Sequence, residues 1–175
     1  MSKSARAMSK SKVKDRTSDI PKADPADVGS IDAIISAAYD VISGPAGKNR
    51  DWDRERSLFF PGARLIPVSR SSQSADLSGK LTPRILDVEG FIARVEPFSK
   101  KEGFYEKEIA RRTQQFGHMA HVWSTYESRH NEDDREPFMR GINSIQLFYD
   151  DRRWWIVNIY WQQESPGDPI PEKYL

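Results

Sequence analysis

The chain has 175 residues, of which 37% are hydrophobic and 30% are charged, and it contains no cysteine. Its 27 Lys and Arg residues nearly balance 26 Asp and Glu residues, which argues against nucleic acid or an anionic membrane as the main partner. The lack of Cys excludes a disulfide scaffold, a thiol nucleophile and a cysteine zinc site. No apolar stretch is long enough to span a bilayer and no sorting signal is visible, so we expect a cytoplasmic protein.

The first residues differ in composition from the rest. Residues 1–22 contain seven basic and two acidic residues, many serines and no apolar periodicity. Such a segment cannot bury enough surface to offset the entropy of ordering. We therefore predict a disordered basic tail over 1–30, one domain over 31–165 and a C-terminal extension over 166–175. The tail is either a basic arm for nucleic acid or an acidic surface, or a solubilising segment.

Helices are expected in the first half of the domain. Ser30 is a good cap for a helix that Gly44-Pro45 ends, and Asp87 is a good cap for a helix that ends before Pro97. A shorter helix is expected over Asp51–Phe59, and a short strand over Ala63–Val68. Residues 69–80 are rich in Ser and read as a loop. The residues expected to face inward from the first helix are Ile31, Ile34, Ile35, Ala38, Tyr39 and Ile42.

The second half has the two-residue period of strands. Four long strands fit residues 104–116, 119–130, 137–149 and 154–163, with tight turns at 117–118 and 151–152. Long antiparallel strands joined by short turns form a bent meander, which the preceding helices cover on one face. We predict an α+β fold, with three N-terminal helices packed on a strongly curved, mainly antiparallel sheet.

The turns predict which side chains share a face of the sheet. For two residues that face each other across the first turn, the residue numbers add up to 235, which places Arg112 opposite Trp123. They sum to 303 about the second turn, which places Ile142 opposite Trp161. Both faces of the last two strands are apolar and aromatic, so both should be covered. The helices cover one face, and we expect a second copy of the chain to cover the other as a homodimer.

The chain resembles the NTF2-like superfamily, which includes ketosteroid isomerases and SnoaL-like polyketide cyclases. The resemblance covers about residues 31–164 and is carried by several short segments: Ala37–Tyr39, Leu58–Leu65, Gly103-Phe104, Ala120–Arg129, Arg140–Ser144 and Arg153–Trp161. It implies a cystatin-like cone with a pocket between sheet and helices, and frequently a homodimer across the outer sheet. It does not imply one activity, because this fold carries many functions.

The isomerase comparison implies positions for the pocket residues. Trp161 matches a Trp that lines the pocket of those enzymes, and Tyr39 matches their oxyanion-binding Tyr. Counting back from Trp161 without a gap places Ser144 where they keep a protonated Asp. Their general base falls near Pro67, which cannot abstract a proton. The resemblance therefore argues against the usual steroid-isomerase chemistry.

These inferences give two sets of residues. The predicted ligand pocket has Tyr39, Trp52 and Phe91 from the helices, and from the sheet Arg112, Gln114, His121, Trp123, Thr125, Arg140, Ile142, Ser144, Gln146, Trp155, Val157, Ile159 and Trp161. The predicted dimer face has Val122, Tyr126, Asn143, Ile145, Leu147, Ile156, Asn158 and Tyr160. Large apolar walls with a few polar groups are typical of small-ligand sites.

Several side chains of the pocket set have alternative roles. His121 is the best candidate for proton transfer, or else it is a hydrogen-bonded structural residue. Arg112 and Arg140 can bind an anionic ligand or pair with nearby glutamates. Tyr39 and Ser144 can bind a ligand carbonyl or satisfy each other. The sequence predicts no metal site, because His118 and His121 point to opposite faces of a strand, and it contains no cofactor-binding motif.

Three functions remain open from the sequence. The first is a homodimer that binds a small apolar or aromatic molecule in the cone-shaped pocket. The second is a lyase, isomerase or hydrolase that uses His121 with Tyr39 as oxyanion donor. The third is an interaction module that binds a partner chain through the outer sheet face.

Overall fold

The computed structural model describes residues 19–70 and 81–175. Most of the predicted basic tail (residues 1–18) and most of the predicted polar loop (residues 71–80) lie outside the described residues. Within the part of the chain that the structure describes, no helix is long and apolar enough to cross a membrane.

The described residues contain four α-helices: α1 (Pro25–Val28), α2 (Ile31–Ile42), α3 (Trp52–Leu58) and, after the first two strands, α4 (Val88–Ser99). Each begins at a side chain that accepts a hydrogen bond from a free backbone N–H of the first turn. For α2 the Ser30 hydroxyl accepts from the Ala33 N–H at 3.0 Å, and for α4 Asp87 accepts from the Gly90 N–H at 2.8 Å. These caps confirm the predicted starts.

Two predictions about the helices are wrong. Helix α1 lies inside the predicted disordered tail, where Val28 is buried and Asp27 pairs with Arg54 of α3 at 2.8 Å. Residues 25–28 therefore belong to the domain. Helix α4 does not end before Pro97 but continues to Ser99, because proline removes only its own N–H and the Lys100 N–H still bonds to Glu96 O at 3.3 Å.

Six strands of the described residues form one sheet in the order β2-β1-β6-β5-β4-β3. Their bounds are β1 (Phe59–Arg70), β2 (Leu81–Pro83), β3 (Tyr105–Phe116), β4 (Met119–Arg129), β5 (Met139–Tyr149) and β6 (Trp154–Gln163). The only parallel pair among them joins β1 to β6. This confirms the predicted α+β class with a mainly antiparallel sheet.

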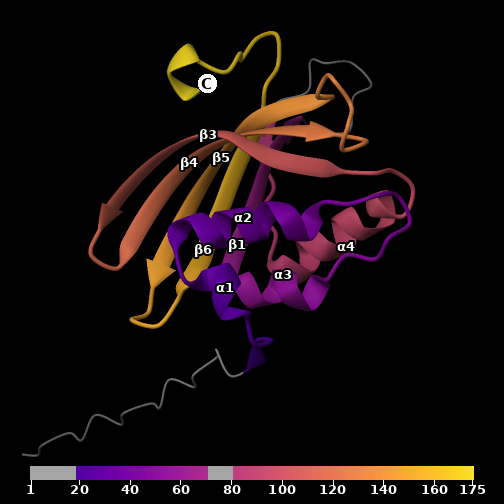
Figure 1. The fold of residues 1–175 in the computed structure, drawn as a ribbon. Coiled ribbons are helices and arrows are strands. Elements are labelled where there is room, and N and C mark those ends of the chain that lie inside the picture. The colour runs from indigo at the N-terminus through magenta and orange to yellow at the C-terminus, as the bar shows by residue number, and fades with distance from the viewer. Residues whose placement is uncertain (1–18, 71–80) are drawn as a thin grey trace, which may run out of the picture.

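The sheet curves over the helices, as Figure 1 shows, and the C-terminal segment with the 3-10 helix η2 (Glu172–Tyr174) lies on the opposite side. We call the side toward the helices the inner face and the other side the outer face. The inner face carries most of the core, and the side chains with 2% exposure or less there include Val122, Tyr126, Ile145, Leu147 and Ile156.

Two β-bulges change the register that the turns alone predict. Pairing about residues 117–118 follows the sum of 235 from Phe116 back to Ala110, but Ile109 is then skipped and Glu108 pairs with Tyr126. Pairing about residues 151–152 follows the sum of 303 only to Leu147 and Ile156. Val157 is then skipped, so Asn143 rather than Ile142 pairs with Trp161. A bulge adds one residue to one strand and exchanges the faces of all residues beyond it.

Candidate functional site

A cavity of about 520 Å³ lies between the inner face of the sheet and the helices. Its walls come from every main element: Tyr39 and Ile42 from α2, Trp52 and Glu55 from α3, Phe91 and Phe98 from α4, Glu106 from β3, Tyr126 from β4, Asn143 and Ile145 from β5, and Ile159 and Trp161 from β6. Most of these side chains are aromatic or aliphatic. This volume is within the usual range for small-molecule sites, about 300–1,000 Å³.

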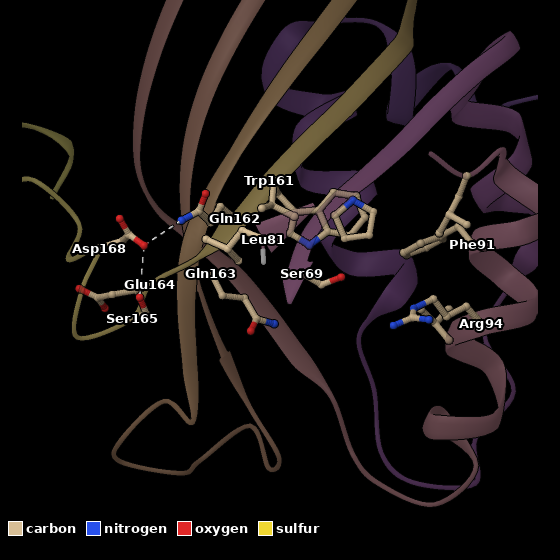
Figure 2. A pocket seen from close by; sticks show the side chains of 14 residues that line it. Ser69, Leu81, Phe91, Arg94, Trp161, Gln162, Gln163, Glu164, Ser165 and Asp168 are labelled. Carbon is tan, nitrogen blue, oxygen red and sulfur yellow. Dashed lines mark hydrogen bonds between the residues drawn. The ribbon is translucent and has the colours of Figure 1, made fainter. Parts of the chain in front are cut away.

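A second hollow of about 380 Å³ adjoins the main cavity and shares residues with it, among them Phe91, Arg94 and Trp161. Figure 2 shows Trp161 of β6 facing Phe91 of α4, with Arg94 on the same helix. The two rings meet edge to face, with centroids 6.2 Å apart. Arg94 is exposed and makes no hydrogen bond or ion pair within the described ranges.

A chain of hydrogen bonds leads from the cavity wall to the surface. Asn143 Nδ2 donates to the Tyr39 hydroxyl at 2.9 Å, and that hydroxyl lies 2.7 Å from Ser124 Oγ. Ser124 Oγ donates its only proton to Glu108 Oε1 at 2.5 Å, so Tyr39 must donate to Ser124. Glu108 in turn is paired with Arg111 at 2.6 Å. The bulge at Ile109 makes this possible, because it places Glu108 and Arg111 both on the inner face.

This chain determines what Tyr39 can do. Burial raises the pKa of Tyr39 above its ordinary value, with a further contribution from the negative charge of Glu106. The hydroxyl proton is directed to Ser124, away from the cavity. Tyr39 therefore presents an acceptor lone pair rather than a donor, which does not fit the predicted role as an oxyanion donor.

Two carboxyl groups line the cavity without a cationic partner. Glu55 is 2% exposed, its Oε2 atom is fully buried, and its side chain makes no hydrogen bond within residues 19–70 and 81–175. Burial raises the pKa of Glu55 to about 8. Glu106 faces the cavity with part of its surface, and Ser128 Oγ donates to its Oε2 at 2.7 Å. Burial raises the pKa of Glu106 to about 7, although the hydrogen bond from Ser128 opposes the shift.

The predicted pocket residues fall on both sides of the sheet. Tyr39, Trp52, Phe91, Ile159 and Trp161 line the inner cavity. The structure contradicts the rest of the predicted set. The outer face carries Arg112, Gln114, His121, Trp123, Thr125, Ile142, Ser144, Gln146 and Trp155; Val157 is the bulged residue, and Arg140 lies at the sheet's end.

The outer residues have their own partners. His121 Nε2 lies 3.1 Å from Ser144 Oγ, and Thr125 Oγ1 donates to Tyr174 O at 2.6 Å. Trp123 packs against Tyr174, with ring centroids 5.5 Å apart. The two arginines pair locally: Arg112 donates to Lys173 O at 3.1 Å and Arg140 pairs with Glu164 at 2.8 Å. A hollow of about 240 Å³ remains between this face and the C-terminal segment, lined in part by Trp123, Ile142, Ser144 and Ile170.

The predicted dimer face is also wrong, because most of its residues lie on the inner face of the sheet. Val122, Tyr126, Ile145, Leu147 and Ile156 lie in the core, and Asn143 bonds to Tyr39. Only Asn158 and Tyr160, which lie beyond the bulge, are on the outer face, opposite Gln146 and Ser144. A homodimer stays a prediction, but its contact surface cannot be the predicted one, because most of those side chains lie inside the subunit.

The bulge at Val157 also changes the match to the isomerases. The count from Trp161 to Ser144 assumed no skipped residue, but Asn143 is the residue that lies opposite Trp161 and beside Tyr39. Pro67 lies next to Trp161 in the parallel β1–β6 pairing and offers no group for proton transfer. The predicted cooperation of His121 with Tyr39 is wrong, since His121 lies on the outer face of the sheet and Tyr39 of α2 lies on the inner side.

Sequence reasoning missed Glu55 and Glu106 as cavity residues. A signal for Glu55 was present. It follows Trp52 by three residues in a predicted helix, and residues three apart share a helix face. A charged residue on the same face as an inward tryptophan is unusual enough to mark a site. No group of His, Asp and Glu that could hold a metal occurs in the described part of the chain.

The comparisons with known proteins concern the fold. A protein of unknown function with a cystatin-like fold from Nostoc punctiforme has a TM-score of 0.56 and 10% identity, with 81% of this chain and 92% of that chain covered. An NTF-2 like protein of unknown function from Silicibacter pomeroyi has a TM-score of 0.51 and 16% identity, with 78% of this chain and 94% of that chain covered. The chain has the NTF2-like, cystatin-like fold. No family model and no curated protein matches the sequence.

Proposed function

We propose that this protein binds a small, mostly apolar molecule in the cavity between the inner face and the helices. The observation that carries the proposal is the cavity itself, about 520 Å³ of space walled by aromatic and aliphatic side chains from both layers. An apolar hollow of this size between two packed layers offers room for a small ligand. The few polar groups along it suit the orientation of a ligand.

Binding of an uncharged fluorescent probe, N-phenyl-1-naphthylamine, tests this proposal. Ala38 is half-buried on α2 and lines the cavity, so Ala38→Phe places a ring in the space where the probe would bind. Ser36 is exposed on the same helix, and Ser36→Phe is the matched control. We expect saturable binding by the wild type and by Ser36→Phe, and a loss of about tenfold or more in Ala38→Phe.

Two results would contradict the proposal. One is the absence of saturable binding to the folded wild type, and the other is equal affinity in Ala38→Phe and Ser36→Phe. Thermal melting of each variant shows that the folded state is retained. A melt in which Ala38→Phe is more stable than the wild type would support the proposal further, since the added ring fills empty space.

An enzyme acting by proton transfer is the second candidate, and Glu106 is the observation that favours it. A carboxyl whose pKa is raised to about 7 beside a ligand-sized cavity is suited to act as general base or acid near neutral pH. Turnover of any ligand that binds, lost in Glu106→Gln with binding retained, would support this candidate. Turnover unchanged in Glu106→Gln would exclude it.

A further inference from the structure

Glu55 of α3 has a buried carboxyl group with no hydrogen-bond partner among the described residues. A buried polar atom without a hydrogen bond costs free energy, and a buried carboxylate without a counter-ion costs much more. Glu55 Oε2 is fully buried and no described residue bonds to the side chain. The rest of α3 has local partners: Asp51 caps the helix, and Arg54 and Arg56 are in ion pairs.

Glu55 faces the cavity rather than another polar layer. It lines the same space as Trp52, one helical turn before it on α3, and as Tyr39 on α2. Burial alone raises its pKa, with no charged neighbour contributing. The chain therefore supplies a desolvated acid beside an aromatic wall and leaves its partner to come from elsewhere.

The other titratable groups along the cavity do not supply a buried cation. Glu106 from β3 and Glu102 before it are acidic, and Tyr39 and Tyr126 are neutral phenols. Arg94 of α4 and His130 after β4 are the basic residues of this lining, and both are exposed. His130 stacks on Phe138, with ring centroids 4.0 Å apart. The buried part of the cavity is thus acidic and aromatic.

We propose that the ligand is a hydrophobic amine, with its protonated nitrogen held by the carboxylate of Glu55 and its apolar body against the aromatic wall. This inference rests on the proposed function and names the chemical class of its ligand. An ammonium group placed against the carboxylate compensates its charge by a charge-assisted hydrogen bond. It is also attracted by the faces of Trp and Tyr rings, as in sites for organic cations. Glu106, on the same cavity, adds a second negative charge.

Binding then involves a proton whose path is defined. In the free protein below about pH 8, Glu55 is mostly protonated. An amine that arrives already protonated displaces the carboxyl proton to solvent, and an amine that arrives neutral takes that proton itself. For a cationic amine, affinity should therefore rise as the pH rises from about 6 to about 8, by up to about tenfold per unit. A ligand that instead accepts a hydrogen bond from protonated Glu55 has the opposite pH dependence.

Three probes with one ring system separate these cases: 1-naphthylmethylamine, 1-naphthalenemethanol and 1-naphthaleneacetate. Titration calorimetry at about pH 8 should show the amine binding about tenfold tighter than the alcohol, with the carboxylate weakest. Glu55→Gln should bring the amine to within about twofold of the alcohol and leave the alcohol unchanged. Glu106→Gln should reduce the preference for the amine over the alcohol by a smaller factor than Glu55→Gln does.

Several outcomes overturn the inference. Equal binding of the amine and the alcohol by the wild type removes the cation preference while the proposed function stands. Tighter binding of the carboxylate would assign the ligand's charge to Arg94 instead. An amine affinity that is flat or falls between about pH 6 and about pH 8 contradicts the role of Glu55. If none of the three probes and no uncharged probe binds, the proposed function itself fails. Should Glu55→Gln fail to fold, the pH profile of amine binding by Glu106→Gln decides, because Glu55 is then the remaining cavity carboxyl with a raised pKa.

Discussion

The two faces of the sheet are alike in composition and different in what covers them. The inner face, with Tyr126, Asn143, Ile145 and Trp161, encloses a cavity of about 520 Å³ against the helices. The outer face also carries tryptophan, isoleucine and small polar residues, but the C-terminal segment packs on it and leaves about 240 Å³. Residue type therefore does not decide which face borders the larger hollow. The layer that covers each face, and the register that assigns residues to that face, decide it.

The buried polar groups sharpen the difference. On the inner side, Glu55 of α3 and Glu106 of β3 line the cavity, and burial raises the pKa of both. On the outer face, Thr125 bonds to Tyr174 and His121 bonds to Ser144, whereas the buried Trp123 Nε1 has no hydrogen-bond partner among the described residues. Each side of the sheet thus has one unpartnered buried polar atom, but only on the inner side does it belong to an acid that lines the cavity of about 520 Å³.

The largest expected effect that tests this difference is the dependence of stability on pH. Glu55 has a pKa of about 8 in the folded protein against an ordinary value of 4.5, and Glu106 about 7. At pH values between the ordinary pKa of 4.5 and the raised pKa values, the unfolded chain binds fewer protons than the folded one. The free energy of unfolding therefore falls as the pH rises from about 5 to about 8. One pKa unit is worth about 1.4 kcal/mol, so a loss on the order of several kcal/mol is expected.

Urea unfolding at about pH 5 and about pH 8 measures this loss. Glu55→Gln should make the two free energies more similar. The exposed Glu172 of the C-terminal segment is the control, and Glu172→Gln should leave the pH dependence unchanged. Stability that is the same at both pH values in the wild type would show that Glu55 is not a buried, unpaired acid.

Truncating one isoleucine on each face is the next largest test. Ile145 is 2% exposed on the inner face, while Ile142, three residues earlier on β5, is half-buried on the outer face. Ile145→Ala should lower the free energy of unfolding by about 2–5 kcal/mol, and Ile142→Ala by about 1 kcal/mol, because it removes less buried apolar area. Denaturant unfolding of the two variants checks this. A larger loss from Ile142→Ala would contradict the assignment of the faces.

A smaller effect is expected when the polar chain on the inner face is broken. Tyr39→Phe leaves Asn143 Nδ2 without its acceptor and removes the hydrogen bond from Tyr39 to Ser124 Oγ, which still donates to Glu108, and this should cost about 1–3 kcal/mol. The outer-face control is Ser144→Ala, which removes only the contact with His121 and should cost less than about 1 kcal/mol. Chemical denaturation of both variants gives the comparison. Equal losses would mean that the outer polar pair is as structurally important as the inner chain.

The smallest effect is expected for the C-terminal segment. Tyr174→Ala removes the ring packed on Trp123 and should cost about 1 kcal/mol or less. Tryptophan emission should shift to longer wavelength as Trp123 becomes wetter, while binding of N-phenyl-1-naphthylamine stays unchanged. Probe binding that depends on Tyr174 would move the ligand site to the outer hollow.

Much of the fold was predictable because it depends on local signals. The caps at Ser30 and Asp87, the turns at 117–118 and 151–152 and the period-two strands all led to elements that the structure contains. Helix α1 was not predictable from composition, because its short amphipathic turn is stabilised by distant contacts of Val28 and Asp27.

The site was predictable only where it did not depend on register across strands. Tyr39, Trp52, Phe91 and Trp161 were assigned to the cavity from helix faces and from the resemblance, and the structure places them along it. Ser144 was assigned by counting back from Trp161 through a strand pair that contains the bulge at Val157, and His121 was assigned to the same face as Ser144. Nothing in the residues around Val157 marks a bulge, and one skipped residue exchanges the two faces.

Methyl NMR of the isoleucine-labelled protein bound to N-phenyl-1-naphthylamine tests most directly which face holds the ligand. Ile42, Ile145 and Ile159 line the inner cavity, whereas Ile142 and Ile170 line the hollow beneath the C-terminal segment. We expect shift changes and NOE contacts from the probe to the methyl groups of the first three residues, with the other two unaffected. Contacts to Ile142 and Ile170 in their place would show that the ligand binds on the outer face and would contradict the proposed site.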